Sequence, residues 1–240
     1  MGKPHLSIVI PAYNEENRLG ETLRRVAEYL DDQSFRAEVI VVDDGSTDAT
    51  VEVARASRGE HRVLVNDGNR GKGYSVRRGA LEAQGDLILF SDADLSAPID
   101  QFDKLRRAIE DGADVAIGSR AMPDSDIQIH QPWYRETMGR TFNFLVRALV
   151  IPGISDTQCG FKAFTGASAR EIFRRQTLPG FAFDVEILYI AQRLGYRVRE
   201  VPVVWRDSPD TRVGAMSDSL AMFSDIIRIR AIHSRLRPLR

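Results

Sequence analysis

The chain has 240 residues, of which 43% are apolar and 28% are charged, and its formal net charge is −1. These values are typical of a globular protein with a buried core, in one large domain or two small ones, and they exclude a whole-protein nucleic-acid binder. The single cysteine, Cys159, excludes an intrachain disulfide and a multi-cysteine zinc site and favours a reducing compartment. No stretch reaches the roughly 18 apolar residues of a membrane span. We therefore expect a cytoplasmic protein, soluble or peripheral to a membrane.

Apolar runs alternate with helical patterns through the first half of the chain. Strands are predicted at residues 6–10, 38–42, 62–65, 87–90 and 114–120, and helices at residues 16–30, from residue 47, at 74–83 and at 99–110. Strands that alternate with helices form right-handed βαβ units around a parallel sheet. The sequence therefore predicts an α/β fold in which helices flank a mostly parallel central sheet.

Polar residues follow the predicted strands at the edge where parallel strands end. They are Pro11–Glu15, Asp43 with Asp44, the glycine-rich loop 67–73, Asp92 with Asp94, and Arg120. The carboxyl ends of parallel strands meet at one edge of the sheet, and open α/β sheets bind their ligands there. We therefore expect one shared site rather than unrelated turns.

Asp92 and Asp94 are separated by one residue and follow the apolar run 87–90 directly. Two carboxylates at this spacing repel each other, so a cation between them would be stabilising. A hard divalent cation takes oxygen ligands from one or two carboxylates and from substrate phosphates. The alternative is a strand that runs into an aspartate-rich turn, because Asp is common in turns. The polar residues at the other strand ends favour the cation site.

Two common nucleotide-binding motifs do not fit this sequence. The dinucleotide motif G-x-G-x-x-G belongs directly after the first strand, where the chain has Pro11–Glu15, and the later Gly71-Lys72-Gly73 has Val76 at the third glycine position. The P-loop requires Ser or Thr after its lysine, and the chain has Gly73 there. Lys72 is either a contact to a phosphate or base, or a solvated turn lysine.

Four segments, in this order and spacing, resemble glycosyltransferase family 2, whose members have the GT-A fold. The segments are Ile8–Glu15, Val41–Asp48, Asn69–Gly73 and Ser91–Asp94. The resemblance implies an α/β domain that binds a nucleotide diphosphosugar, with Mg²⁺ or Mn²⁺ on its diphosphate. Asp94 is the expected direct metal ligand, and Asp92 is a second ligand or a contact to the sugar nucleotide. The expected donor-binding residues are Pro11, Ala12, Tyr13, Glu15, Asp43, Asp44, Lys72, Asp92, Ala93 and Asp94.

Three segments of the second half resemble the polyprenyl-phosphate branch of this family, which includes dolichyl-phosphate glucosyl- and mannosyltransferases. They are Asp156–Lys162, Phe181–Leu188 and Glu200–Trp205, and the first two are more similar to glucosyl members. The resemblance implies inverting transfer of glucose from UDP-glucose to a polyprenyl or dolichyl phosphate. Three rival interpretations stay open: GDP-mannose as donor, a glycan hydroxyl as acceptor with Asp184 as general base, and a non-catalytic nucleotide-sugar sensor.

The resemblance spans roughly residues 5–230 and predicts a GT-A catalytic domain at residues 1–215. Its donor half is expected at about 1–120 and its acceptor half at about 121–215. Glucosyl members usually carry an N-terminal membrane helix, whereas residues 1–5 here run straight into the first predicted strand. Residues 121–133 are polar and contain proline, and we expect a mobile loop near the acceptor.

Residues 216–240 are predicted to form a basic amphipathic helix. Its apolar stripe is expected to contain Leu220, Phe223, Ile226 and Ile227, extending to Arg230 with Ala231. Its positive charge comes from five arginines, at positions 228, 230, 235, 237 and 240. Such a helix either contacts a membrane surface or docks on its own domain or a partner.

A phosphate acceptor would require positive charge rather than a general base. A phosphate monoester has a second pKa of about 6, so it is largely dianionic and already nucleophilic at neutral pH. Cations must offset its repulsion by the donor diphosphate. Arginine binds phosphate through two parallel hydrogen bonds, and the acceptor candidates are Arg120, Arg135, Arg212 and, as an alternative to Arg212, Arg206. The expected catalytic residues are Asp92, Asp94, Arg120 and Arg212.

Two residues of the second half have competing interpretations. Asp184 is either the general base of a hydroxyl-accepting enzyme, the N-cap of a helix that runs to about Gly195, or a support for neighbouring site residues. Cys159 has no Cys or His near it in sequence, so we expect a packed small residue.

Overall fold

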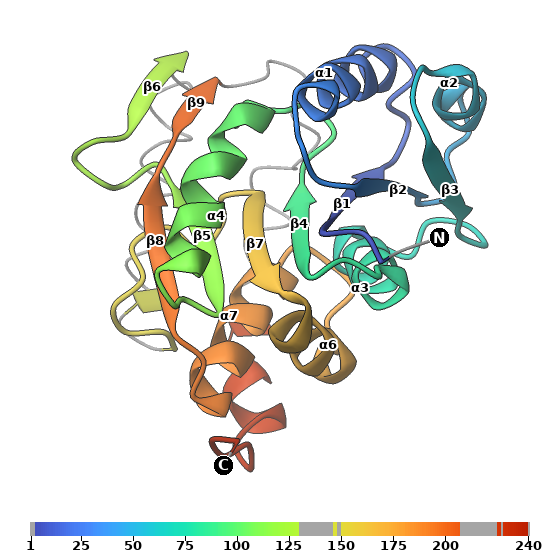
Figure 1. The fold of residues 1–240 in the computed structure, drawn as a ribbon. Helices are drawn as coiled ribbons and strands as arrows, with labels where there is room; N and C mark the ends of the chain where they lie inside the picture. Colours follow the sequence, from blue (N-terminus) through green and yellow to red (C-terminus); the bar gives the residue numbers. More distant parts are fainter. Residues whose placement is uncertain (1–2, 130–145, 148–149, 207–224, 227, 240) are drawn as a thin grey trace.

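A seven-stranded sheet runs through the centre of the molecule, with helices on both of its faces (Figure 1). The structure is a computed structural model that describes residues 3–129, 146–147, 150–206, 225–226 and 228–239. The strand order is β3-β2-β1-β4-β7-β5-β8. The strands are β1 (Leu6–Ala12), β2 (Ala37–Asp43), β3 (His61–Val65), β4 (Leu87–Ser91), β5 (Val115–Ser119), β7 (Phe161–Thr165) and β8 (Val198–Pro202).

Strand β7 is the exception to the parallel order. It pairs antiparallel with β4 and β5, whereas the other neighbouring strands pair in parallel. Its register places Lys162 opposite Phe90, next to the strand that ends in the aspartate pair. The prediction of a mostly parallel sheet flanked by helices is confirmed, and the antiparallel strand is an addition that the βαβ pattern did not predict.

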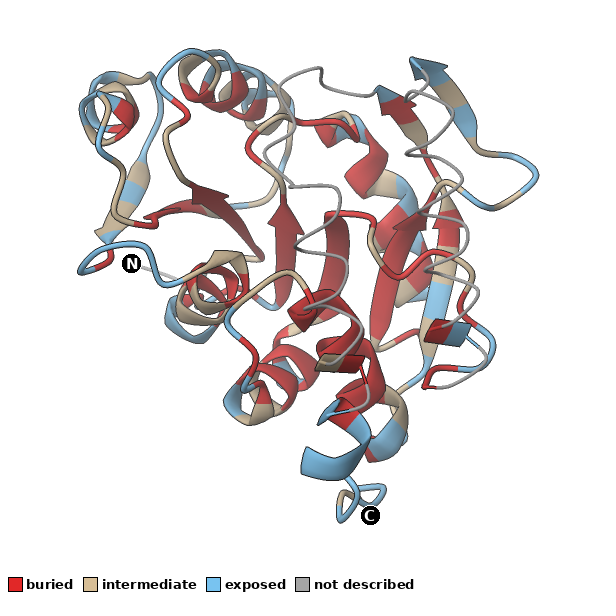
Figure 2. Ribbon diagram, turned by 180° about the vertical axis from the view of Figure 1, so that it is seen from behind, coloured by how far each residue is buried: buried red, intermediate tan, exposed pale blue. Residues whose placement is uncertain are grey.

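The two faces of the sheet carry separate hydrophobic cores because successive side chains of a strand point to opposite faces. Val9 of β1 belongs to the core with α3, α6 and α7, whereas its neighbours Ile8 and Ile10 belong to the core with α1, α2 and α4. Figure 2 shows the central strands buried between these layers. The helices are α1 (Leu19–Asp31), α2 (Thr50–Ala56), α3 (Lys72–Glu82), α4 (Phe102–Glu110), α6 (Gly166–Arg175) and α7 (Phe183–Leu194), and a 3-10 turn, η1 (Ile99–Gln101), precedes α4.

Two helices begin at residues other than the predicted ones, because of the residues that precede them. Helix α3 begins at Lys72 rather than at residue 74, because Gly71, at φ 99°, supplies the non-helical residue before it. Helix α2 begins at Thr50 rather than at residue 47. Asp48 accepts a hydrogen bond from the Thr50 amide at 3.0 Å and so organises the turn that precedes the helix.

The prediction of a mobile loop over residues 121–133 is wrong for part of its length. Residues Asp126–Ile129 form strand β6, which pairs in parallel with β9 (Val204–Arg206) in a small second sheet. This strand could not be predicted from the local sequence, because its partner strand lies far along the chain and most of its side chains are exposed. Residues 130–133 lie outside the described residues.

The described part of the C-terminal segment docks on its own domain, as one of the two alternatives had it. Ile226, Ile229 and His233 are buried against the core that contains α7, while Arg230 and Ala231 are exposed, so the predicted extension of the apolar stripe to these two residues is wrong. Leu220, Phe223 and Ile227 lie outside the described residues. Among the helices that the structure describes, none combines the length and apolar character needed to cross a bilayer.

Candidate active site

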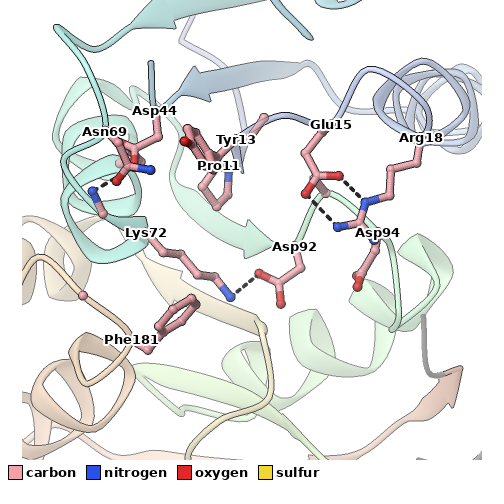
Figure 3. Close-up of a pocket in the computed structure, with 15 residues that line it drawn as sticks. Pro11, Tyr13, Glu15, Arg18, Asp44, Asn69, Lys72, Asp92, Asp94 and Phe181 are labelled. Carbon is pink, nitrogen blue, oxygen red and sulfur yellow. Dashed lines mark hydrogen bonds and ion pairs between the residues drawn. The ribbon is translucent and has the colours of Figure 1, made fainter. Parts of the chain in front are cut away.

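A cavity of about 390 Å³ opens at the carboxyl ends of β1, β2 and β4 (Figure 3). Every donor residue expected from the sequence lines this cavity except Asp43. Asp43 is the last residue of β2 and is buried. The glycine turn before α3 and the segment before α7 close the cavity from two further sides. The lining residues are Pro11, Ala12, Tyr13, Glu15, Arg18, Asp44, Asn69, Gly71, Lys72, Ser75, Asp92, Ala93, Asp94, Gly180 and Phe181.

The two aspartates at the end of β2 have different surroundings. The Asp44 carboxylate accepts hydrogen bonds from the backbone amides of Arg70, at 3.0 Å, and Gly71, at 2.8 Å, and from the side chains of Asn66 and Ser75. It therefore fixes the glycine turn. Asp43 Oδ2 accepts two backbone amides, but its buried Oδ1 has no hydrogen-bond partner among the residues that the structure describes.

Lys72 points into the cavity and meets the aspartate pair. Its Nζ lies 2.6 Å from Asp92 Oδ1 and 5.4 Å from the centre of the Phe90 ring (Figure 3). Burial alone would lower the pKa of Lys72, but the nearby carboxylates, Asp92 first among them, raise it above its ordinary value. Lys72 is thus a charged ammonium within the site, and the alternative of a solvated turn lysine is wrong.

Asp94 is the carboxylate best placed to receive a cation. Its Oδ1 accepts the Ser96 amide at 2.9 Å, and burial, together with the negative charge of Asp92, raises its pKa. A divalent cation would reverse this effect by favouring the charged carboxylate. No cluster of three or more His, Cys, Asp or Glu side chains that could hold a metal occurs in the described part of the chain. The residues therefore fit an ion that takes its remaining ligands from phosphates and water, as Mg²⁺ does.

A fully buried ion pair lies next to β4. Lys162 Nζ donates to the Asp184 carboxylate and, at 2.7 Å, to the Cys159 carbonyl. Asp184 is 2% exposed and does not line the cavity, and burial raises its pKa despite the ammonium beside it. It lies in the first turn of α7 without capping it, so the N-cap prediction is wrong. Cys159 is buried as expected, and burial raises the pKa of its thiol to about 12.

Arg120 is engaged by a partner that the sequence did not reveal. Its Nε and Nη2 donate to the two carboxylate oxygens of Asp156 at 2.7 and 2.8 Å, and its guanidinium lies 4.7 Å from the centre of the Trp205 ring. Burial alone would raise the pKa of Asp156, but Arg120 more than offsets this and lowers it to about 2. The fork expected for an acceptor phosphate is therefore occupied by Asp156.

Of the other arginines expected at the acceptor, Arg206 lies within the described residues, and it does not line the cavity. Arg206 is exposed on β9, and its Nε donates to Gln128 Oε1 at 2.8 Å. Arg135 and Arg212 lie outside the described residues.

The cavity and the order of its motifs agree with comparisons to known proteins. The family model "Glycosyl transferase family 2" matches residues 7–173. The dolichyl-phosphate beta-glucosyltransferase of Drosophila melanogaster is 40% identical over 242 residues, a match that covers 93% of this chain and 74% of that protein. The chain belongs to glycosyltransferase family 2.

Solved structures show the same GT-A fold for this glycosyltransferase. The structure of mannosyl-3-phosphoglycerate synthase from Rubrobacter xylanophilus aligns with a TM-score of 0.73 at 19% identity, covering 99% of this chain and 77% of that one. Glucosyl-3-phosphoglycerate synthase from Mycobacterium tuberculosis, in complex with Mn²⁺ and UDP-glucose, aligns with a TM-score of 0.69 at 21% identity, covering 99% and 80% of the two chains.

Six lining residues of the transferase are absent from the donor-binding residues expected from the sequence. Asn69 and Gly71 lie in the glycine turn, Ser75 lies in α3, and Arg18, just before α1, donates to Glu15 Oε1 at 2.7 Å. Gly180 and Phe181 come from the segment before α7, more than 80 residues after Asp94 in the sequence. Only Lys162, on the strand β7 outside the cavity, had a usable signal, because a lysine inside the apolar run Phe161–Phe164 requires a buried acidic partner.

Gly160 is the closest neighbour of the Asp92 carboxylate on the β7 side. The Asp92 amide donates to the Gly160 carbonyl at 3.0 Å, and a Cβ on Gly160 would overlap Asp92 Oδ2. Gly160→Ala is therefore expected to displace the carboxylate and to lower turnover by about 100-fold, as misplacements of about 1 Å can do. Steady-state kinetics with Gly20→Ala as control measure this, since a Cβ on Gly20 meets nothing closer than Val53 at 3.4 Å. Wild-type turnover in Gly160→Ala would contradict the expectation.

Proposed function

We propose that this family 2 transferase moves glucose from UDP-glucose to a polyprenyl phosphate, such as dolichyl phosphate, with inversion and with the help of Mg²⁺ or Mn²⁺. The observation that carries the proposal is the convergence of Lys72, Asp92 and Asp94 in a cavity formed by the motifs of this family. The glucosyl donor and the lipid acceptor are supported by similarity over nearly the whole chain to a protein named for both. The proposal divides the catalytic domain, residues 1–215, into a donor half at about 1–120 and an acceptor half at about 121–215.

The donor would lie along the ends of β1, β2 and β4. Its base would contact Pro11–Tyr13. Its diphosphate would lie near Lys72 and Asp94, where the ammonium offsets negative charge. Asp92, held by Lys72, would face the sugar.

The metal would be held by Asp94, with Asp92 beside it. When bound, it would stabilise the negative charge that develops on the departing diphosphate. The protein's own contribution is to fix this carboxylate. Asp94 is anchored by the Ser96 amide, and the Ala93 carbonyl accepts the Thr22 hydroxyl of α1 at 2.5 Å.

The acceptor phosphate would be its own nucleophile. It needs no general base, which agrees with the buried position of Asp184 away from the cavity lining. The positive charge that guides the acceptor is proposed to come from Arg120, shared with Asp156, and from Arg135 and Arg212 or Arg206. A hydroxyl-accepting enzyme would instead require a carboxylate with access to the acceptor.

A screen of donors against acceptors tests this proposal. Purified protein would be incubated with UDP-glucose or GDP-mannose and with a short polyprenyl phosphate or the corresponding free polyprenol. We expect glucosyl-lipid product only from UDP-glucose with the phosphate, and only with Mg²⁺ or Mn²⁺ present. Product from GDP-mannose alone would replace the donor. Product from the free alcohol that disappears in Asp184→Asn would establish the hydroxyl mechanism instead.

The C-terminal segment is proposed to contact the membrane surface with its outer side. Arg228, Arg230, Arg235 and Arg237 are exposed there, and Ile232 and Leu239 are 39% and 48% exposed. Basic and apolar groups on one surface bind anionic lipid at about 1 kcal/mol per charge. Co-sedimentation with phosphatidylserine vesicles should fall at least tenfold in Arg228→Glu/Arg230→Glu. A control that reverses two arginines elsewhere, Arg174→Glu/Arg199→Glu, should bind as the wild type does, and equal losses in both variants would contradict a local contact.

A further inference from the structure

The segment 176–181, between α6 and α7, forms one wall of the cavity. Gly180 and Phe181 line the cavity opposite the sheet, and Phe181 lies below Lys72 in Figure 3. Two hydrogen bonds join this wall to the glycine turn at the start of α3. The Tyr74 amide donates to the Pro179 carbonyl at 3.1 Å, and Gln176 Nε2 donates to the Gly73 carbonyl at 2.9 Å.

The contact between the wall and the glycine turn leaves no spare volume. A Cβ on Gly73 would lie 2.6 Å from Phe183 Cβ and 2.7 Å from the Leu178 carbonyl oxygen. A Cβ on Gly71 would overlap the Pro179 carbonyl oxygen. Because close-packed segments transmit displacements, the position of the wall also sets the position of Lys72.

Glu186, in the first turn of α7, accepts hydrogen bonds from residues of the wall. Its Oε1 accepts the amide of Thr177 at 2.9 Å and the Thr177 hydroxyl at 2.7 Å, and its Oε2 accepts the Leu178 amide at 2.8 Å. The carboxylate is fully buried. Burying a carboxylate costs free energy unless it is hydrogen-bonded. The remaining hydrogen-bond partner of Glu186 therefore stabilises its contact with the wall.

That remaining partner is His233, from the C-terminal segment 47 residues further along the chain. Its Nε2 lies 2.7 Å from Glu186 Oε1, and the residue is only 5% exposed. The same segment is tied to the other end of α7, where Arg193 Nη2 donates to the Leu236 carbonyl at 2.7 Å and the Leu239 amide donates to the Leu194 carbonyl at 3.0 Å. These contacts anchor the residues that follow His233 to the C-terminal end of α7.

We propose that His233 is a positioning residue of the donor site: by completing the hydrogen bonds of Glu186 it holds the wall 176–181, and through it Lys72, in the conformation that binds the donor. The inference rests on the proposed function of the cavity. It assigns to the C-terminal segment a part in donor binding, although none of its described residues lines the cavity.

Donor affinity in two His233 variants tests this role. His233→Leu removes the hydrogen bond at similar volume, whereas His233→Gln can place an amide N–H near the same position. We expect His233→Leu to raise the Kd for UDP with Mn²⁺ and the KM for UDP-glucose about tenfold, with the acceptor KM unchanged, and His233→Gln to restore donor affinity to within about threefold. The matched control is Ser234→Ala, whose exposed hydroxyl donates to the Ala231 carbonyl within its own turn.

A second variant keeps the test decisive if His233→Leu does not fold. Thr177→Val removes the hydroxyl bond to Glu186 from the wall side, at an exposed position. It should weaken donor binding in the same selective way, and combining it with His233→Gln should not add the two effects fully. Donor and acceptor constants that change together, or donor binding by His233→Leu or Thr177→Val that equals wild type, would overturn the role of His233. Failure of the wild type itself to bind UDP would instead overturn the proposed donor.

Discussion

Asp94→Ala is expected to lower sugar transfer by about 1000-fold while leaving the fold intact. In the proposed function Asp94 would hold a cation on the donor diphosphate, and removing one electrostatic stabiliser of a leaving group costs about 100- to 1000-fold. Loss of the metal itself should have an effect at least as large, so chelation by EDTA should abolish turnover of the wild type. Initial rates with saturating UDP-glucose and polyprenyl phosphate measure both effects.

The control for this variant is an exposed carboxylate in a loop at the same edge of the sheet. Asp67, in the loop after β3, is exposed and does not line the cavity, so Asp67→Ala should keep wild-type turnover. A titration of Mn²⁺ against UDP affinity separates metal binding from other roles of Asp94. In the wild type Mn²⁺ should strengthen UDP binding, and in Asp94→Ala this strengthening should disappear. Full metal-dependent turnover in Asp94→Ala would exclude Asp94 as the ligand.

Lys162→Met is expected to destabilise the fold by about 3–5 kcal/mol, because it leaves the buried Asp184 carboxylate without its partner. The double variant Lys162→Met/Asp184→Leu should recover most of this loss, since replacing both members of a buried pair with apolar residues is often neutral. Urea unfolding followed by circular dichroism measures the free energies of unfolding. Lys104→Met, at an exposed lysine, should change stability by less than about 0.5 kcal/mol.

The recovered double variant also tests what the pair does for the site. Lys162 donates a hydrogen bond to the Cys159 carbonyl, and the carbonyl of the next residue, Gly160, accepts one from the Asp92 amide. The ion pair of Lys162 with Asp184 therefore supports the position of Asp92. The double variant should therefore be folded yet slower in transfer than the wild type. A single variant within about 1 kcal/mol of wild-type stability would show that Asp184 accommodates the loss, for instance by protonation, as its raised pKa allows.

Local pattern and the geometry of parallel strands are enough to predict five of the seven strands of the sheet and most of the residues that line the cavity. Alternating apolar and helical segments identify the first five strands of the sheet, and the carboxyl ends of such strands must meet at one edge. For this reason the amino-acid sequence assigns residues as distant as Tyr13, Asp44 and Asp94 to one site, and the cavity contains all three.

The pairing of buried polar and charged side chains, by contrast, depends on the tertiary fold. Lys162 with Asp184, Arg120 with Asp156 and His233 with Glu186 join residues that are 22, 36 and 47 positions apart. Periodicity shows which face of a strand or helix is buried, but not which opposite charge lies against it, because a buried charge is stabilised by its partner in space rather than by its neighbours in sequence. The antiparallel insertion of β7 creates the first of these pairs and sets Gly160 against Asp92. Both contacts follow from how distant segments pack together, which no local pattern in the chain encodes.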